Sequence, residues 1–133
     1  MTAALIGIAS GIVTILLVAL LKLRDTKLIY GLVLSGIGFL YVGYVWTDLT
    51  AFVVCAVQAI VFLLLGYYGV KRNAALLAAG YFLHGCWDMI YNYFAAPGLV
   101  PPHYDWFCFS IDCTIGIYLL LYSRKFHFIK INA

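Results

Sequence analysis

Three ionisable side chains stand inside otherwise apolar stretches in the C-terminal half of this 133-residue chain. His84 and Asp88 are four residues apart, so a helix places them on one face, and Asn92 extends that stripe by another turn. Asp112 interrupts the next apolar run in the same way. Histidine and carboxyl groups carry general acid–base catalysis because they donate, accept and relay protons. Ionisable groups inside membrane segments are costly and by default indicate function.

The composition indicates the class of protein that positions these groups. Hydrophobic residues make up 66% of the chain and charged residues 10%, with a mean hydropathy of +1.06. A soluble domain carries about 25% charged residues, so this chain has too few to cover a surface in water. The predicted fold class is an all-α membrane protein, a bundle of five transmembrane helices in one domain over residues 1–133. The net charge of +3 comes from basic loops and does not indicate a nucleic-acid partner.

Five apolar runs are long enough to cross a bilayer, which needs about 20 residues. They are predicted over residues 3–22, 28–47, 49–70, 74–94 and 106–123. Basic residues follow the first run and none precedes it, which favours an uncleaved helix over a signal peptide. In this arrangement all eight Lys and Arg residues fall on the same side. The positive-inside rule then places the N-terminus outside and the C-terminus in the cytoplasm.

Small residues in the first two runs predict close helix packing. Gly7 and Gly11 form a G-x-x-x-G pattern in the first run, and the second run is rich in glycine and serine. Tyr41, Tyr44 and Trp46 gather at the far end of the second run. They are interpreted as an aromatic belt at the membrane interface.

The depths of the two aspartates match. Asp88 and Asp112 each lie about six residues below the outer end of their run, roughly 9 Å deep at 1.5 Å per residue. The two runs are joined directly and are antiparallel, so we expect the carboxyl groups within roughly 8 Å of each other, close enough to interact. His84 and Gln58 are expected nearer the midplane. The predicted pocket lies in the outer half between the fourth and fifth runs, backed by the second and third.

These positions suggest separate roles for the polar residues. In the catalytic set, Asp88 or Asp112 donates a proton, the other carboxylate stabilises positive charge, and His84 returns or relays the proton. Trp87 and Tyr91 can stabilise a cation through their π faces. The substrate-binding set comprises Trp87, Tyr91, Asn92 and Gln58. Gln58 also has a plain structural interpretation, as a hydrogen-bonding residue between helices.

A purely structural role for the aspartates is the main alternative. Interhelical polar contacts in membranes average about 0.6 kcal/mol, whereas placing one Asp at the centre of a membrane helix costs about 2.5–3.5 kcal/mol. One contact does not offset two such costs, so function is favoured. Two close carboxyl groups that share a proton reduce the cost further.

A metal site is less favoured by the sequence. His84 and Asp88 at i, i+4 could ligate one ion, with Asp112 and a cysteine completing the set. No second histidine lies nearby inside a run, so no metal or other cofactor is expected. The cysteines lack a C-x-x-C pattern and are interpreted as small buried hydrophobic residues; they are Cys55, Cys86, Cys108 and Cys113.

About 35 residues of the C-terminal half resemble a family of short bacterial integral membrane proteins of unknown function. The shared pattern is G-x-x-x-H-x-x-W-D, a proline-containing loop, then C-x-x-x-D. It corresponds here to Gly80, His84, Trp87, Asp88, Pro97, Cys108 and Asp112. Family members carry histidines soon after the W-D, where this chain has Tyr91 and Asn92, and this departure also weakens the metal interpretation. The resemblance implies a multi-pass protein of the bacterial inner membrane with a buried polar site, and it implies no activity.

Three functions agree with these features. The first is an intramembrane acid–base enzyme that isomerises, cyclises or hydrates an isoprenoid or lipid. Sterol isomerase-type membrane proteins are similar in placing a histidine and an acid four residues apart, a likeness of mechanism only. The second is a small proton-coupled transporter, and the third is an assembly or stabilising subunit of a membrane complex. Membrane lipids and a lipophilic small molecule are the expected partners, and oligomer formation stays open.

Overall fold

The computed structural model describes residues 1–21, 25–94 and 100–131, which fold into helices joined by short turns. Its elements are α1 (Thr2–Leu20), α2 (Thr26–Tyr44), α3 (Leu49–Lys71), α4 (Ala74–Phe94) and α5 (Tyr104–Ile131). No strand occurs in the described ranges. The predicted all-helical class is therefore confirmed, and each helix overlaps one of the five predicted runs.

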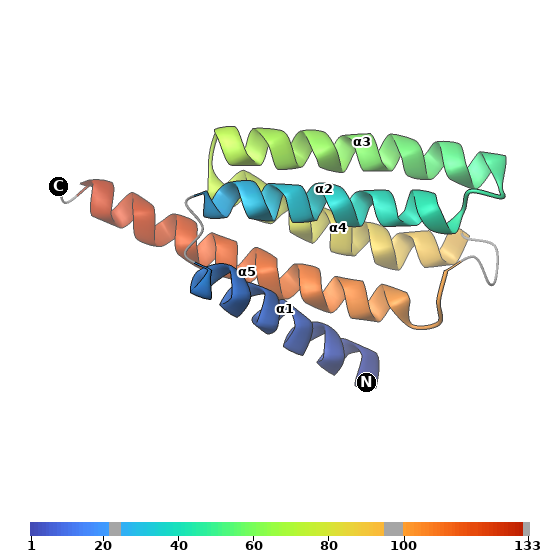
Figure 1. Ribbon diagram of the computed structural model, residues 1–133, viewed down its shortest axis with the longest axis horizontal. Coiled ribbons are helices and arrows are strands. Elements are labelled where there is room, and N and C mark those ends of the chain that lie inside the picture. The colour runs from blue at the N-terminus through green and yellow to red at the C-terminus, as the bar shows by residue number, and fades with distance from the viewer. Residues whose placement is uncertain (22–24, 95–99, 132–133) are drawn as a thin grey trace.

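The largest difference from the predicted runs is at the C-terminal end. The fifth run was expected to end at residue 123, but α5 continues as helix to Ile131 and projects beyond the other helices (Figure 1). Among the described residues, four helices are long and apolar enough to cross a membrane: α1, α2, α3 and the Tyr104–Ser123 part of α5. The helix outside this group is α4, which carries His84 and Asp88. The orientation of the chain across a membrane stays a prediction.

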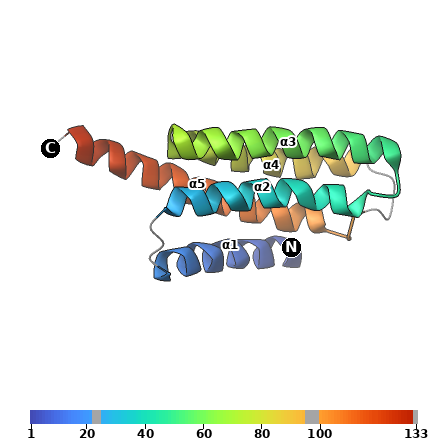
Figure 2. The same cartoon turned by 45° about the horizontal axis from the view of Figure 1, so that its top comes forward.

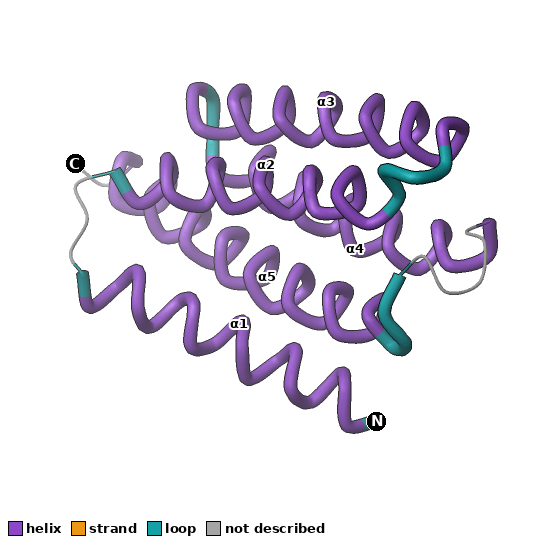
Figure 3. Tube along the Cα trace, turned by 45° about the vertical axis from the view of Figure 1, so that its right-hand side comes forward, coloured by secondary structure: helices purple, strands orange, loops and turns teal. Residues whose placement is uncertain are grey.

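Successive helices run up and down, so both ends of the bundle gather several connections (Figures 1 and 2). The most extensive packing is between α4 and α5, followed by α2 on α3 and α1 on α5. Because α1 packs chiefly on α5, it lies at one side of the bundle, with α3 at the opposite side (Figure 3). The α4–α5 pair thus forms the centre, which is where the sequence placed the polar site.

Glycines allow the closest helix contacts, as the small-residue pattern predicted. A Cβ added at Gly11 would lie 2.9 Å from Thr114 Cβ of α5, and a Cβ at Gly66 of α3 would lie 2.8 Å from the Gly31 carbonyl oxygen of α2. Real side chains do not fit at such distances, so the glycines let these helices approach each other closely. Close contact at these points fixes which face of each helix points inward.

The buried residues of α2 form one stripe along the helix. Tyr30, Leu34, Gly38 and Tyr41 are buried, at the three- and four-residue spacing of one helix face. Large apolar side chains remain exposed on the outside of the bundle. An apolar exterior of this extent is expected of helices that face lipid. The site therefore lies inside a bundle whose exterior is largely apolar.

Candidate functional site

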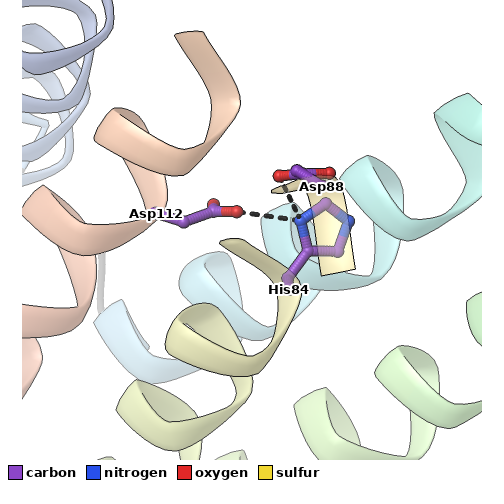
Figure 4. A group of neighbouring side chains, drawn as sticks. All are labelled: His84, Asp88 and Asp112. Carbon is purple, nitrogen blue, oxygen red and sulfur yellow. Dashed lines mark hydrogen bonds and ion pairs between the residues drawn. The ribbon is translucent and has the colours of Figure 1, made fainter. Parts of the chain in front are cut away.

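His84, Asp88 and Asp112 meet in the interior of the bundle (Figure 4). His84 Nδ1 lies 2.8 Å from Asp112 Oδ2 and 3.3 Å from Asp88 Oδ2. All three side chains are at most 1% exposed. Potential ligand atoms of the three residues lie within 4.8 Å of one another, which confirms the expectation that the carboxyl groups lie within roughly 8 Å.

Helix geometry and one glycine bring the three together. His84 and Asp88 occupy the same face of α4, one turn apart, and Asp112 comes from the facing side of α5. Gly85 lies at this interface, where an added Cβ would be 3.2 Å from Phe109 Cδ2 and 3.4 Å from Asp112 Cβ. The absence of a side chain at Gly85 therefore leaves room for the Phe109 side chain of α5 beside α4, at the level where Asp112 meets the imidazole.

The two nitrogens of the His84 ring have different surroundings. Since Nδ1 is the atom that faces both carboxyl groups, it is the nitrogen that donates to Asp112 when that group is ionised. Nε2 is buried and has no hydrogen-bond partner among the described residues. The ring packs edge-on against Phe62 of α3, with centroids 4.7 Å apart, and lies 6.4 Å from the Tyr41 ring of α2. A histidine held through Nδ1 with Nε2 free is arranged to exchange protons at Nε2.

Asp88 makes fewer hydrogen bonds than Asp112 among the described residues. Neither of its oxygens makes a hydrogen bond of good geometry within the described part of the chain. The Tyr41 hydroxyl interacts with the Asp88 carboxyl from α2 but does not complete such a bond. Buried polar groups are nearly always paired. His84 Nε2 and the Asp88 carboxyl group therefore retain hydrogen-bonding capacity that the described residues do not use.

Two predicted binding residues lie together beside the cluster. Trp87 stacks on Tyr91 with centroids 5.6 Å apart, and Tyr91 in turn meets Tyr41 edge-on at 5.0 Å. The Trp87 Nε1 and Tyr91 hydroxyl atoms are buried without a hydrogen-bond partner among the described residues. The side chain of Asn92 lies outside the described residues.

Gln58 is 5% exposed on α3, and neither atom of its amide group has a partner in the described ranges. The interpretation of Gln58 as a hydrogen-bonding residue between helices therefore receives no support.

Tyr41 and Phe62 are site residues that the sequence did not single out. Tyr41 was interpreted as part of an interfacial belt, but it is 1% exposed and contacts both His84 and Asp88. A signal was available, because Tyr41 continues the buried stripe of Tyr30, Leu34 and Gly38. Phe62 carried a weaker signal, since only its place one turn after Gln58 sets its face of the apolar α3 apart.

The three ionisable side chains also form a donor set for a metal ion. One imidazole nitrogen and two carboxylate oxygens are ligands that zinc and several other divalent ions accept. Catalytic zinc sites use three protein ligands and keep one position open. All four cysteines are free, and none of them belongs to this group. The residues present therefore fit a three-ligand ion as well as a proton-exchange site.

Together the fold and site define a small helical bundle with apolar, membrane-length helices and a buried His–Asp–Asp cluster. The chain belongs to the DUF6010 family, a family of unknown function, which it matches over residues 2–125. No curated protein and no solved structure matches it. The expectation of an uncharacterised family thus agrees with the comparison.

Proposed function

We propose that this protein is an intramembrane acid–base catalyst that acts on a lipophilic substrate. The observation that carries the proposal is the arrangement of His84, whose Nδ1 contacts Asp112 while its buried Nε2 has no hydrogen-bond partner in the described part of the chain. An imidazole oriented through one nitrogen by a carboxylate and open at the other is the recurring form of a general base. Packing alone requires no such free nitrogen.

The geometry suggests a distinct role for each group. Asp112 fixes the orientation and tautomer of the ring through the 2.8 Å contact with Nδ1. His84 Nε2 takes the proton from the substrate. Asp88, whose oxygens make no hydrogen bond of good geometry with the described residues, is the candidate proton donor. Its 3.3 Å distance from Nδ1 also lets it stabilise the imidazolium when that forms.

Isomerisation of a double bond is the simplest reaction that this set performs. The Asp88 proton forms a new carbon–hydrogen bond, and another substrate carbon loses a proton to His84 Nε2. Release of the Nε2 proton to water and uptake of one proton by Asp88 restore both groups, so the cycle needs no oxidant, reductant or second substrate. Cyclisation uses the same two proton transfers, and hydration adds one water. The aromatic faces of Trp87 and Tyr91 suit a cationic intermediate.

The lipophilic substrate follows from the location of the cluster. His84, Asp88 and Asp112 are buried within a bundle whose exterior is apolar, so a molecule dissolved in the bilayer reaches them more easily than a polar metabolite does. An isoprenoid or a lipid with an unsaturated chain has the required chemistry.

A proton-coupled transporter and an assembly subunit are the two alternatives, and they predict no change in any lipid. The test incubates the purified protein with an extract of its native membranes in heavy water. With the wild-type protein, mass spectrometry should find deuterium on carbon in one lipid class, because the donor delivers a solvent-exchanged proton. His84→Gln should abolish the incorporation. Absence of deuterium from every lipid with the folded wild-type protein would contradict the proposal.

A further inference from the structure

An open pocket lies at the end of the bundle where α2 begins. Its volume is about 460 Å³, within the range of about 300–1,000 Å³ seen for small-molecule sites. The lining comes from the start of α2, the end of α3 and the C-terminal part of α5, and comprises Asp25, Thr26, Lys27, Leu28, Val70 and Tyr122. None of these residues belongs to the acid–base cluster, so the pocket is a separate site.

The pocket contains one side chain of each charge. Asp25 supplies a carboxylate and Lys27 supplies an ammonium group. Neither of them forms an ion pair within the described part of the chain. Asp25 is also the N-cap residue of α2, yet its side chain makes no capping hydrogen bond, the usual role of an aspartate at that position. Both charged groups can therefore pair with a bound molecule.

The pocket lies at the depth of lipid headgroups if the helices span a bilayer. Tyr104 and Tyr122 are 18 positions apart on α5, roughly 27 Å at 1.5 Å per residue, which is close to the thickness of a hydrocarbon core. At the same end of the bundle, Lys71 Nζ lies 4.5 Å from the centroid of the Tyr67 ring. Basic and aromatic residues together are typical of a membrane interface.

A headgroup that carries both charges fits this pocket better than a purely anionic one. A phosphate group accepts charge-assisted hydrogen bonds from Lys27, and a primary ammonium group donates them to the Asp25 carboxylate. A trimethylammonium group has no N–H donor, and an anionic headgroup brings a second negative charge next to Asp25. Leu28, which is 44% exposed, and Val70 offer apolar contacts to the chains below the headgroup.

We propose that this pocket binds the headgroup of a phospholipid that has a primary ammonium group, as phosphatidylethanolamine does. The phosphate pairs with Lys27 and the ammonium group pairs with Asp25. The bound lipid contacts α2, α3 and α5 together at this end of the bundle. Binding uses no proton transfer and no residue of the acid–base cluster, so this inference goes beyond the proposed function and does not depend on it.

Native mass spectrometry of the delipidated full chain in detergent tests the proposal. The probes are phosphatidylethanolamine, phosphatidylcholine and phosphatidylglycerol with identical oleoyl chains, titrated separately. The first molecule of phosphatidylethanolamine should bind about tenfold more tightly than either of the others, because it alone makes charge-assisted hydrogen bonds with both Asp25 and Lys27. Equal affinity for the three lipids would overturn the proposal.

Two variants test the charged pair separately. Asp25→Asn keeps the size of the side chain and a good N-cap residue, so the fold should be retained while the preference for phosphatidylethanolamine over phosphatidylglycerol falls to about onefold. Lys27→Gln should weaken the binding of both lipids alike. Lys71→Gln is the matched control, since it removes a basic residue at the same end but outside the lining, and it should change neither affinity. A preference that survives Asp25→Asn would overturn the proposal.

Soluble glycerophosphoethanolamine separates a lipid site from a site for the free headgroup. Because it lacks the acyl chains that contact apolar surface, an excess of about 100-fold should leave the lipid bound. Displacement of the lipid by an equimolar amount would overturn the lipid as the occupant. His84→Gln should keep the lipid preference while it loses deuterium incorporation, so each proposal can fail without the other.

Discussion

His84 Nδ1 and Asp112 Oδ2 lie 2.8 Å apart across the α4–α5 interface, in side chains at most 1% exposed. Asp112 thereby fixes the position of Nδ1. The other ring nitrogen, Nε2, has no hydrogen-bond partner among the described residues. This contact joins the two helices that pack most extensively against each other. The same contact therefore contributes to helix packing at the centre of the bundle and also orients the His84 ring.

Neutral amide variants separate a chemical role of the carboxyl groups from a structural one. Asp88→Asn and Asp112→Asn keep the size and most of the hydrogen-bonding capacity while they remove the titratable proton. We expect both variants to unfold within about 1 kcal/mol of the wild-type protein in detergent, because an amide can still bridge helices. Deuterium incorporation should fall by about 100-fold or more, the usual contribution of a general acid or base. Full incorporation by both stable variants would show that the pair acts only in packing.

Gly85 controls how closely α5 approaches the imidazole. Gly85→Ala places a Cβ 3.2 Å from Phe109 Cδ2 and 3.4 Å from Asp112 Cβ, so the Phe109 side chain must move by a few tenths of an ångström at the α4–α5 interface. We expect a loss of about 1–3 kcal/mol in unfolding free energy, typical of overpacking, together with reduced activity. Gly36→Ala is the matched control, since no atom lies within 4 Å of a Cβ added there. That change should stabilise the helix by about 0.5–1 kcal/mol. An unchanged unfolding free energy and an unchanged activity in Gly85→Ala would show that the helix contact at Gly85 does not position Asp112.

The Tyr41 hydroxyl faces the proposed proton donor. Tyr41→Phe preserves the ring contacts with Tyr91 and His84 but removes the group that interacts with Asp88. Thermal stability should therefore change little, while activity drops about tenfold, equivalent to 1.4 kcal/mol in the transition state. Tyr44→Phe removes a hydroxyl from the neighbouring ring and should leave activity intact. Equal activities for the two variants would exclude a role for Tyr41 beyond packing.

The topology prediction depends on the one-sided basic residues. In a protein whose four native cysteines are replaced by alanine, a single cysteine is placed at His103 or at Lys71. A membrane-impermeant thiol reagent should label the His103→Cys protein in intact cells and the Lys71→Cys protein only after lysis, as the positive-inside rule predicts. The opposite labelling pattern would reverse the orientation.

Much of the site was predictable because its polar residues are rare in such a setting. The i, i+4 spacing of His84 and Asp88 and the matched depth of Asp112 predicted a cluster between α4 and α5, which the structure has. Both signals rest on helix periodicity and antiparallel packing, which a single sequence reveals.

The contributions from α2 and α3 were harder to predict. Which side chains reach His84 depends on the rotation of each helix, set by backbone contacts such as Gly31 against Gly66. An apolar helix gives almost no periodic signal for that rotation, and Phe62 therefore went unnoticed. Tyr41 was misassigned for a different reason, because a tyrosine near a helix end fits both a membrane interface and a buried stripe.

The most direct test of the account is nitrogen-15 NMR of His84 as the sole histidine. His103→Gln and His127→Gln remove the other two histidines, and the ring is labelled at both nitrogens. The account predicts that Nδ1 keeps its proton throughout a pH titration, because Asp112 accepts it, while Nε2 gains and loses one. Asp112→Asn should weaken that preference for Nδ1. A neutral ring that carries its proton on Nε2, with Nδ1 bare or bound to a metal ion, would contradict the account.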